Sequence, residues 1–267
     1  MKEATFRKIR DVVYDLSGIT LGDNKQALVR ARISKRMRYL GIESHEAYLN
    51  HILGDAGVTE IEHMLDAIST NTTNFYREPA HFDQMRSIIA GWQKQGLHQL
   101  RIWSAAGSTG EEPYTLAIET LEAINGGKTD VKILATDIAP SVLRVAMKGE
   151  YQENKLTPIP KHLRSRYFSR RRIGDEYQYT VSDRLREIVL FRQFNLSQTP
   201  YPIRTGLDII FCRNVMIYFD RPIRTRLVEE FHRLLKPGGY LFVGHAESIT
   251  GLSKGFKCLK PSVYVRE

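Results

Sequence analysis

The sequence has little cysteine: Cys212 and Cys258 are the only two thiols among its 267 residues. Two cysteines are too few for a disulfide framework or for a cysteine-based zinc site, so both kinds of site are excluded. Each lies in a stretch that is typical of a strand. We therefore expect both side chains to be plain thiols of the protein core, and we expect no bound metal.

Long apolar runs are also missing. No stretch approaches the roughly 18 consecutive apolar residues that a membrane-spanning helix needs. Residues 1–7 lack the apolar segment and the small-residue cleavage site of a signal peptide. These absences predict a cytoplasmic protein without direct membrane insertion. Nothing in the sequence requires more than a monomer.

Acidic residues are outnumbered: 30 Asp and Glu stand against 39 Lys and Arg, which leaves a formal net charge of +9. Such a charge fits nucleic acid, an anionic membrane surface or an acidic protein partner. The basic residues cluster near the N-terminus and around residues 161–172, which predicts one or two basic docking faces. The alternative is that the charge serves solubility alone.

Residues 1–75 show helical periodicity and no strand pattern. Ser17-Gly18 and Gly41 are typical helix ends, and Ser44 is typical of a helix N-cap. The helix from Lys25 to Arg38 has an apolar stripe, and basic residues cover its other faces. We therefore expect a small all-α domain with one strongly basic helix, followed by a linker or helix at residues 76–96.

From residue 97 to residue 267, short apolar strands alternate with helices. Strands are expected at residues 100–105, 131–136, 207–211 and 240–244, and helices at residues 111–124, 140–147 and 222–235. This alternation implies right-handed crossovers and a mostly parallel sheet, which is an α/β architecture. Residues 257–265 should add an antiparallel edge strand. Residues 165–192, with Tyr177–Val181 and Ile188–Leu190, break the alternation and predict a small antiparallel insertion.

The loop at residues 106–110 lies between an expected strand and an expected helix, where backbone N–H groups can bind an anion. It is not a GxGxxG loop, so it argues weakly for a dinucleotide. A cofactor with a lone carboxylate and an ammonium needs less clearance, and Glu111 or Glu112 could face its positive charge. Asp137 ends the next strand, where a carboxylate can accept both hydrogen bonds of a ribose diol. Alternatively, the two glutamates only complement the helix dipole.

Two further segments carry polar residues at positions suited to a site. Residues 71–79 are dense in polar side chains ahead of a proline, which favours a loop. In it, Arg77 offers a planar fork of donors that suits a carboxylate. A buried strand also runs directly into Arg213-Asn214 at the carboxyl edge of the sheet, with Tyr218 close behind. The alternative is that residues 71–79 are an ordinary surface loop, that Arg213 is a surface charge, and that Tyr218 and Phe219 are aromatic residues of the core.

Together these segments resemble one family. The stretches NTTNFYRE, RIWSAAGSTGEEPY, ILATDI, FCRNVMIYF and LLKPGGYLFVGHAES are similar to the successive blocks of the CheR-type chemotaxis protein methyltransferases, in the same order. The resemblance spans about residues 5–265. It implies a Rossmann-like class I methyltransferase domain with an inserted β-subdomain, after a helical domain. The implied cofactor is S-adenosylmethionine, with S-adenosylhomocysteine as product. The implied acceptors are glutamates on the cytoplasmic helices of chemoreceptors.

The resemblance also implies which residues form the cofactor site. By similarity these are Asn71, Thr73, Arg77, Glu112, Asp137, Asn195, Leu196, Arg213 and Asn214. The first three would lie at the sulfonium and methionine end of the cofactor. Glu112, rather than Glu111, would approach its amino group, and Asp137 would hold the ribose. Asn195-Leu196 would flank the adenine, and Arg213-Asn214 would close the pocket.

The expected catalytic residues are Arg77, which would orient the acceptor carboxylate, and Tyr218, which would fix geometry beside the transferable methyl group. On the basic helix, Arg32, Lys35 and Arg36 are expected to dock the glutamate-rich receptor helices. The hairpin stretch at residues 170–177 has a single glycine, where family members that bind a receptor peptide are glycine-rich. We therefore expect an enzyme that needs no such peptide.

Three other functions compete with this interpretation. A nucleic-acid methyltransferase would suit the basic charge, but no stacking positions or base-flipping signature is found, so we expect no nucleic-acid partner. A non-catalytic adaptor that binds receptors and senses S-adenosylmethionine would not need Arg77 and Tyr218. A nicotinamide-dependent dehydrogenase is disfavoured, because GxGxxG is absent and the histidines are scattered.

Overall fold

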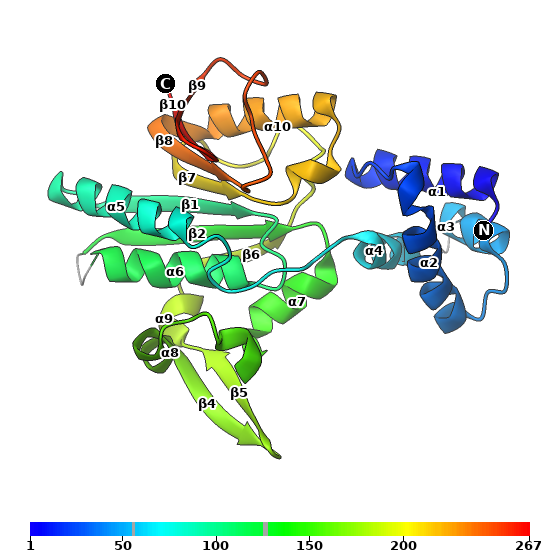
Figure 1. Ribbon diagram of the computed structural model, residues 1–267, viewed down its shortest axis with the longest axis horizontal. Helices are drawn as coiled ribbons and strands as arrows, with labels where there is room; N and C mark the ends of the chain where they lie inside the picture. The colour runs from blue at the N-terminus through cyan, green and yellow to red at the C-terminus, as the bar shows by residue number, and fades with distance from the viewer. Residues whose placement is uncertain (55–56, 125–127) are drawn as a thin grey trace.

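A computed structural model describes residues 1–54, 57–124 and 128–267. The N-terminal part is a bundle of helices that lies beside the rest of the molecule (Figure 1). Its elements are α1 (Glu3–Ser17), η1 (Asp23–Lys25), α2 (Gln26–Leu40), α3 (His45–Leu53) and α4 (Gly57–Ile68). Phe6, Ile9 and Val13 recur at helical spacing on α1 and are at most 2% exposed. They join the buried faces of α2, α3 and α4 in one core.

The expected ends of these helices are confirmed. Gly18 and Gly41 follow α1 and α2 with φ angles of 71° and 68°, a left-handed conformation that costs glycine little. The Ser44 hydroxyl accepts a hydrogen bond from the Ala47 N–H at 3.0 Å, which caps α3. Local sequence signals therefore set these three helix ends.

The larger part of the chain is built on a seven-stranded sheet with the order β6-β2-β1-β7-β8-β10-β9. Its strands are β1 (Gln99–Ala105), β2 (Asp130–Asp137), β6 (Val189–Gln193), β7 (Leu207–Cys212), β8 (Leu235–Val243), β9 (Phe256–Lys260) and β10 (Val263–Arg266). The first five strands are parallel to one another, whereas β10 is antiparallel to both β8 and β9. The expected α/β architecture with a mostly parallel sheet is thus confirmed.

Helices cover both faces of this sheet (Figure 1). The helices of this part are α5 (Ala80–Lys94), α6 (Glu111–Ile124), α7 (Pro140–Lys148), η3 (Met216–Tyr218) and α10 (Arg221–Leu234). Successive strand residues point to opposite faces, so Ile102 packs in the core shared with α5, α6 and α7. Its neighbour Trp103 packs in the core shared with α10. The strand order changes direction beside β1, which places a crevice at the carboxyl ends of β1 and β7.

A second, three-stranded antiparallel sheet projects from the larger sheet as a β-subdomain (Figure 1). Its elements are β3 (Glu150–Gln152), η2 (Glu153–Leu156), α8 (Lys161–Tyr167), β4 (Phe168–Ile173), β5 (Glu176–Val181) and α9 (Asp183–Arg186). The expected antiparallel insertion is present, but it begins earlier than residue 165, with β3. Ile188–Leu190 does not belong to it, because β6 pairs in parallel with β2 in the larger sheet.

Two other expectations need correction. Cys212 is buried as expected, but Cys258 is exposed, because β9 is the last strand of the sheet and most of its side chains face solvent. Residues 257–265 form two strands rather than one, and a turn at Ser262, with a φ angle of 65°, reverses the chain between them.

None of the helices within the described ranges combines the length and apolarity that crossing a membrane requires. The domain boundaries at residues 75 and 97 stay predictions.

Candidate functional site

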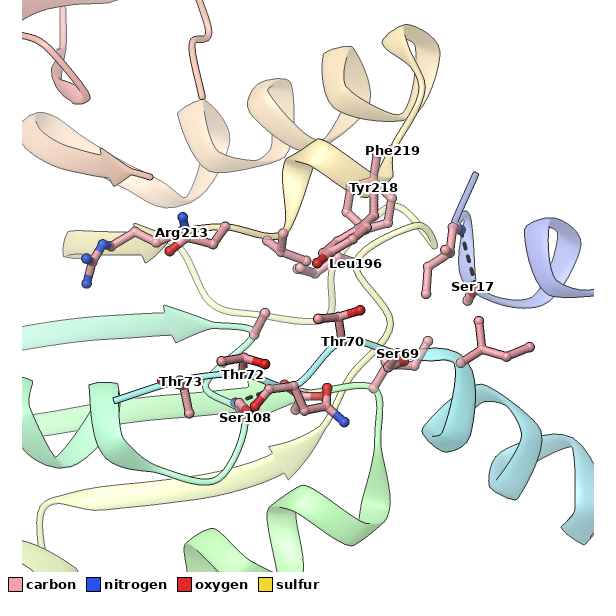
Figure 2. Close-up of a pocket in the computed structure, with 18 of the residues that line it drawn as sticks. Ser17, Ser69, Thr70, Thr72, Thr73, Ser108, Leu196, Arg213, Tyr218 and Phe219 are labelled. Atoms are coloured by element: carbon pink, nitrogen blue, oxygen red, sulfur yellow. Dashed lines mark hydrogen bonds between the residues drawn. The ribbon is translucent and has the colours of Figure 1, made fainter. Parts of the chain in front are cut away.

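One cavity collects all of the residues that the sequence singled out for cofactor binding and catalysis. The residues of that set that line it are Asn71, Thr73, Arg77, Glu112, Asp137, Asn195, Leu196, Arg213, Asn214 and Tyr218. The cavity encloses ≈ 1240 Å³ when its open mouth is included. It lies at the carboxyl ends of β1, β2 and β7, and side chains of α2 and η1 complete its far wall. Figure 2 shows Tyr218 and Leu196 across the cavity from Thr72, Thr73 and Ser108.

The backbone around this cavity is unusually strained. Among the described residues, six non-glycine positions have a positive φ, and five of them belong to the three segments that form the site. These five are Tyr76, Glu78, Ala106, Ser108 and Asn214. Such conformations persist only where surrounding contacts hold them, and they are frequent at functional sites. The three loops therefore depend on contacts with surrounding side chains to keep these conformations.

Arg213 makes hydrogen bonds that connect the segments around the cavity to one another. Its side chain is only 1% exposed, and its guanidinium donates to Glu78 at 2.9 Å and to Glu112 at 3.0 Å. It also donates to the backbone carbonyl of Arg77. A fork of donors thus joins the loop of residues 71–79, α6 and the end of β7. Arg213 lines the cavity, but its donors are already used within the protein.

The two adjacent glutamates of α6 have different surroundings. Glu112 lines the cavity and accepts from the Ser104 hydroxyl at 2.8 Å and from Arg213. Burial raises the pKa of Glu112, while the hydrogen bonds and the charge of Arg213 act in the opposite direction. Glu111 does not line the cavity, and its carboxylate pairs with Lys155 at 3.0 Å. The geometry therefore favours Glu112 over Glu111 as the acid that meets a bound cation.

Asp137 ends β2 at the floor of the cavity. One carboxylate oxygen accepts from the Ser108 N–H at 2.9 Å, and the other accepts from the Ala139 N–H at 3.0 Å. Burial raises the pKa of Asp137, and these N–H donors counteract part of that rise. Each oxygen keeps a further lone pair. The carboxylate is thus positioned to accept from two neighbouring hydroxyl groups of a ligand.

Three further predicted residues, Asn195, Tyr218 and Arg77, also line the cavity. Asn195 uses its amide to donate to the Leu16 carbonyl at 2.7 Å, so its side chain joins the helical bundle to the sheet. Lys25 lies 5.1 Å from the centre of the Tyr218 ring, a cation–π contact at the far wall. Arg77 is exposed, and one of its donors reaches the Thr72 carbonyl at 3.0 Å. Arg77 therefore keeps donors for an incoming acid.

The three docking residues expected on α2 divide into two kinds. Arg32 donates to the carbonyls of Ala67 and Ser69 at 3.1 and 2.9 Å, and so caps the end of α4. Arg36 forms a bidentate ion pair with Glu60, which is only 4% exposed. Lys35 is exposed. Two of the three side chains therefore have partners inside the bundle, and Lys35 is the one that faces solvent.

Glu78 was not predicted as a site residue, although it directly follows Arg77. Its carboxylate bonds to Arg213 and also to the Asn214 amide at 3.3 Å. The ring nitrogens of His81 and His245 lie 3.4 and 3.9 Å from the same carboxylate. Burial and the charge of Arg213 lower the pKa of His81 to about 4, so it is neutral at pH 7. The only available signal for Glu78 was an acid within the polar loop of residues 71–79.

The chemistry of the cavity lining fits the cofactor that the resemblance implies. Two carboxylates, Glu112 and Asp137, suit a ligand with a positive end and a ribose diol. Ile138, Phe194 and Leu196 supply apolar lining that suits a base. Asn71 and Thr73 provide polar groups of the kind that would hold a zwitterionic tail. Nothing in this set conflicts with S-adenosylmethionine.

Comparisons with known proteins agree along the chain. The family model described as "CheR methyltransferase, all-alpha domain" matches residues 4–69, and "CheR methyltransferase, SAM binding domain" matches residues 71–265. Chemotaxis protein methyltransferase 2 of Pseudomonas aeruginosa is 40% identical over 259 residues, which cover 97% of this chain and 91% of that protein. Chemotaxis protein methyltransferase of Escherichia coli is 34% identical over 264 residues, which cover 99% and 91%.

Proposed function

The chain belongs to the CheR family and is an S-adenosylmethionine-dependent protein methyltransferase of chemotaxis, and we propose that its acceptors are glutamate side chains on the cytoplasmic helices of chemoreceptors. One observation supports this most strongly. The cavity that suits the cofactor also has Arg77 and Tyr218 on its walls, so a carboxylate could be bound beside the methyl donor. The products would be glutamate methyl esters and S-adenosylhomocysteine.

The acceptor carboxylate does not need a general base. Its pKa is near 4.3 in water, so it is already ionised at pH 7. It is a weak nucleophile because water solvates it tightly. The site must therefore remove that water and hold one oxygen in line with the sulfur–methyl bond, while the cofactor supplies an electrophilic methyl group. Positioning of this kind can supply about 7–11 kcal/mol in favourable cases.

In this proposal, Arg77 orients the acceptor carboxylate, and Tyr218 makes a hydrogen bond that fixes the position of the methyl donor or the acceptor. Arg77 suits the task because it is exposed at the cavity and keeps unused donors. It must not bind the carboxylate too tightly, since the acceptor loses its charge as the neutral ester forms. Equal stabilisation of the ground state and the transition state would not raise the turnover rate.

These roles predict different kinetic losses. Arg77→Met should lower kcat/KM for the receptor about 100-fold, because a misplaced acceptor loses part of the benefit of positioning. Tyr218→Phe should lower kcat about tenfold, the usual worth of one hydrogen bond in the transition state. Steady-state methylation of receptor-containing membranes measures both constants. Arg144→Met removes an exposed arginine of α7 and serves as the control; a loss as large as that of Arg77→Met would refute the assignment.

We also propose that the exposed side of α2 steers the acidic receptor helices toward the cavity. Lys35→Glu should raise the receptor KM about threefold at low salt, with less effect at high salt, because exposed charges act over about 10 Å and are screened. The cofactor dissociation constant should not change. Lys94→Glu makes the same charge change at the end of α5, away from α2. An unchanged receptor KM for Lys35→Glu would remove α2 from the docking surface.

The same proposal covers location and partners. We place the enzyme in the cytoplasm as a monomer, without a nucleic-acid partner and without a need for a receptor peptide. Sedimentation would test the monomer, and a competition assay with RNA would test the absence of nucleic-acid binding. The adaptor alternative predicts cofactor binding without turnover, so repeated methyl transfer by one enzyme molecule would exclude it.

A further inference from the structure

The base of the β-subdomain makes direct contact with the two loops that form the cofactor cavity. Lys155, on η2, donates from its ammonium group to the Thr73 carbonyl at 3.2 Å and to Glu111 at 3.0 Å. Thr73 belongs to the loop of residues 71–79, and Glu111 begins α6 directly after the loop of residues 106–110. A single side chain of the subdomain therefore joins both loops.

The carboxylate that Lys155 meets is deeply buried. Glu111 is only 1% exposed, and its second oxygen accepts from the Thr109 hydroxyl. A buried carboxylate without a cation is costly, so Glu111 would hold the Lys155 side chain in one place. Lys155 itself is 42% exposed, which weakens the attraction through solvent screening. The consequence is a defined position for the Thr73 carbonyl rather than a large gain in stability.

Aromatic residues of the subdomain reinforce this contact. The Tyr151 hydroxyl donates to the Thr109 carbonyl at 2.7 Å. A Cβ at Gly110 would lie 2.7 Å from that hydroxyl and 3.1 Å from the Ala146 Cα, and the φ angle of 96° also favours glycine there. Phe75, in the other loop, is 1% exposed and packs edge-on against Tyr151 and Phe168, with ring centres 5.0 and 5.8 Å apart. Both loops thus rest on the subdomain.

The loops are also joined to each other inside the cavity. The Ser108 hydroxyl donates to the Asn71 carbonyl at 2.9 Å, and the Ser108 N–H donates to Asp137. A shift of the Thr73 segment would therefore be transmitted to the residues that face the ribose and the methionyl group. Lys155 lies outside the cavity lining and would act only through these neighbours.

We propose that Lys155 is a positioning residue through which the β-subdomain sets the affinity for S-adenosylmethionine. This inference rests on the proposed function, because it takes the loops of residues 71–79 and 106–110 to be the cofactor site. It assigns the subdomain a part in cofactor binding that does not depend on any receptor contact.

The test is calorimetric titration of the purified proteins with S-adenosylhomocysteine, together with steady-state kinetics and thermal unfolding. Lys155→Met should raise the dissociation constant roughly five- to tenfold, as expected for loss of a half-exposed, charge-assisted contact. The kcat at saturating S-adenosylmethionine should stay within about twofold, because Lys155 does not touch the reacting groups. Lys155→Arg should restore most of the affinity, since a guanidinium can reach both acceptors.

Lys161→Met is the matched control, because Lys161 is an exposed lysine of α8 in the same subdomain. A dissociation constant for Lys155→Met equal to that of wild type would overturn the inference. So would a lower binding stoichiometry with unchanged affinity, since that result means partial unfolding. If wild type itself does not bind S-adenosylhomocysteine, the proposed function fails along with the inference; wild-type binding with an unaffected Lys155→Met refutes the inference alone.

Discussion

Arg213→Met should destabilise the protein by about 3–5 kcal/mol and lower methyl transfer at least about 100-fold. The substitution keeps most of the side-chain volume but removes the cation that faces Glu78 and Glu112. Both carboxylates would then be largely buried without their partner. The carbonyl of Arg77 would lose its donor as well, so the strained loop of residues 71–79 would lose its anchor. Urea unfolding and initial rates measure the two effects.

Two further variants separate charge from geometry. Arg166→Met removes an arginine that pairs with Glu122 at 2.8 Å, and because the two side chains are 57% and 26% exposed, it should cost about 1 kcal/mol or less. The triple variant Arg213→Met, Glu78→Gln, Glu112→Gln should recover stability, because it no longer has unpaired buried charges. It should not recover activity, because the loop of residues 71–79 still lacks the Arg213 side chain that anchors it. A loss for Arg213→Met no greater than that for Arg166→Met would refute the anchoring role of Arg213.

Asp137→Asn should raise the dissociation constant of S-adenosylhomocysteine about 100-fold, equivalent to about 2.7 kcal/mol. Both oxygens of Asp137 accept backbone N–H donors, from Ser108 and from Ala139. An amide would turn an NH₂ group toward one of these donors. It would also lose the charge that favours the ribose diol. Calorimetric titration measures the change without any receptor.

Asp130→Asn is the matched control for this prediction. Asp130 begins the same strand, β2, at the end opposite the cavity, and its side chain is 57% exposed in a pair with Arg101. Its substitution should leave cofactor affinity unchanged, since a surface pair contributes little. A change of less than about threefold for Asp137→Asn would mean that the carboxylate does not contact the ligand.

The positions of Asp137 and Arg213 could be predicted from the strand pattern, because parallel strands place their carboxyl ends at one edge, whereas Asn71, Thr73, Asn195 and Leu196 were expected only from the family resemblance. Asp137 ends one apolar strand and Arg213 directly follows another, so the pattern was enough to bring them near the loop of residues 106–110. The helix ends at Gly18, Gly41 and Ser44 followed from local chemistry in the same way. These features depend on short stretches of sequence.

What could not be predicted depends on contacts between distant residues. Glu78 lies 135 residues from Arg213, and no local pattern shows that the two side chains meet. The inward use of Arg32 and Arg36 was missed for the same reason, because their partners lie on α4 or directly after it. Ile188–Leu190 was placed with the hairpin because a short apolar run does not reveal which sheet it joins.

Transfer of a labelled methyl group tests the proposed activity directly. The purified protein is incubated with S-adenosylmethionine labelled on its methyl group and with membranes that carry chemoreceptors, and the receptor bands are then treated with mild alkali. We predict that the receptor bands carry label and that alkali releases this label as methanol, as expected for glutamate methyl esters. Label that resists alkali, or no label despite demonstrated cofactor binding, would contradict the proposed activity.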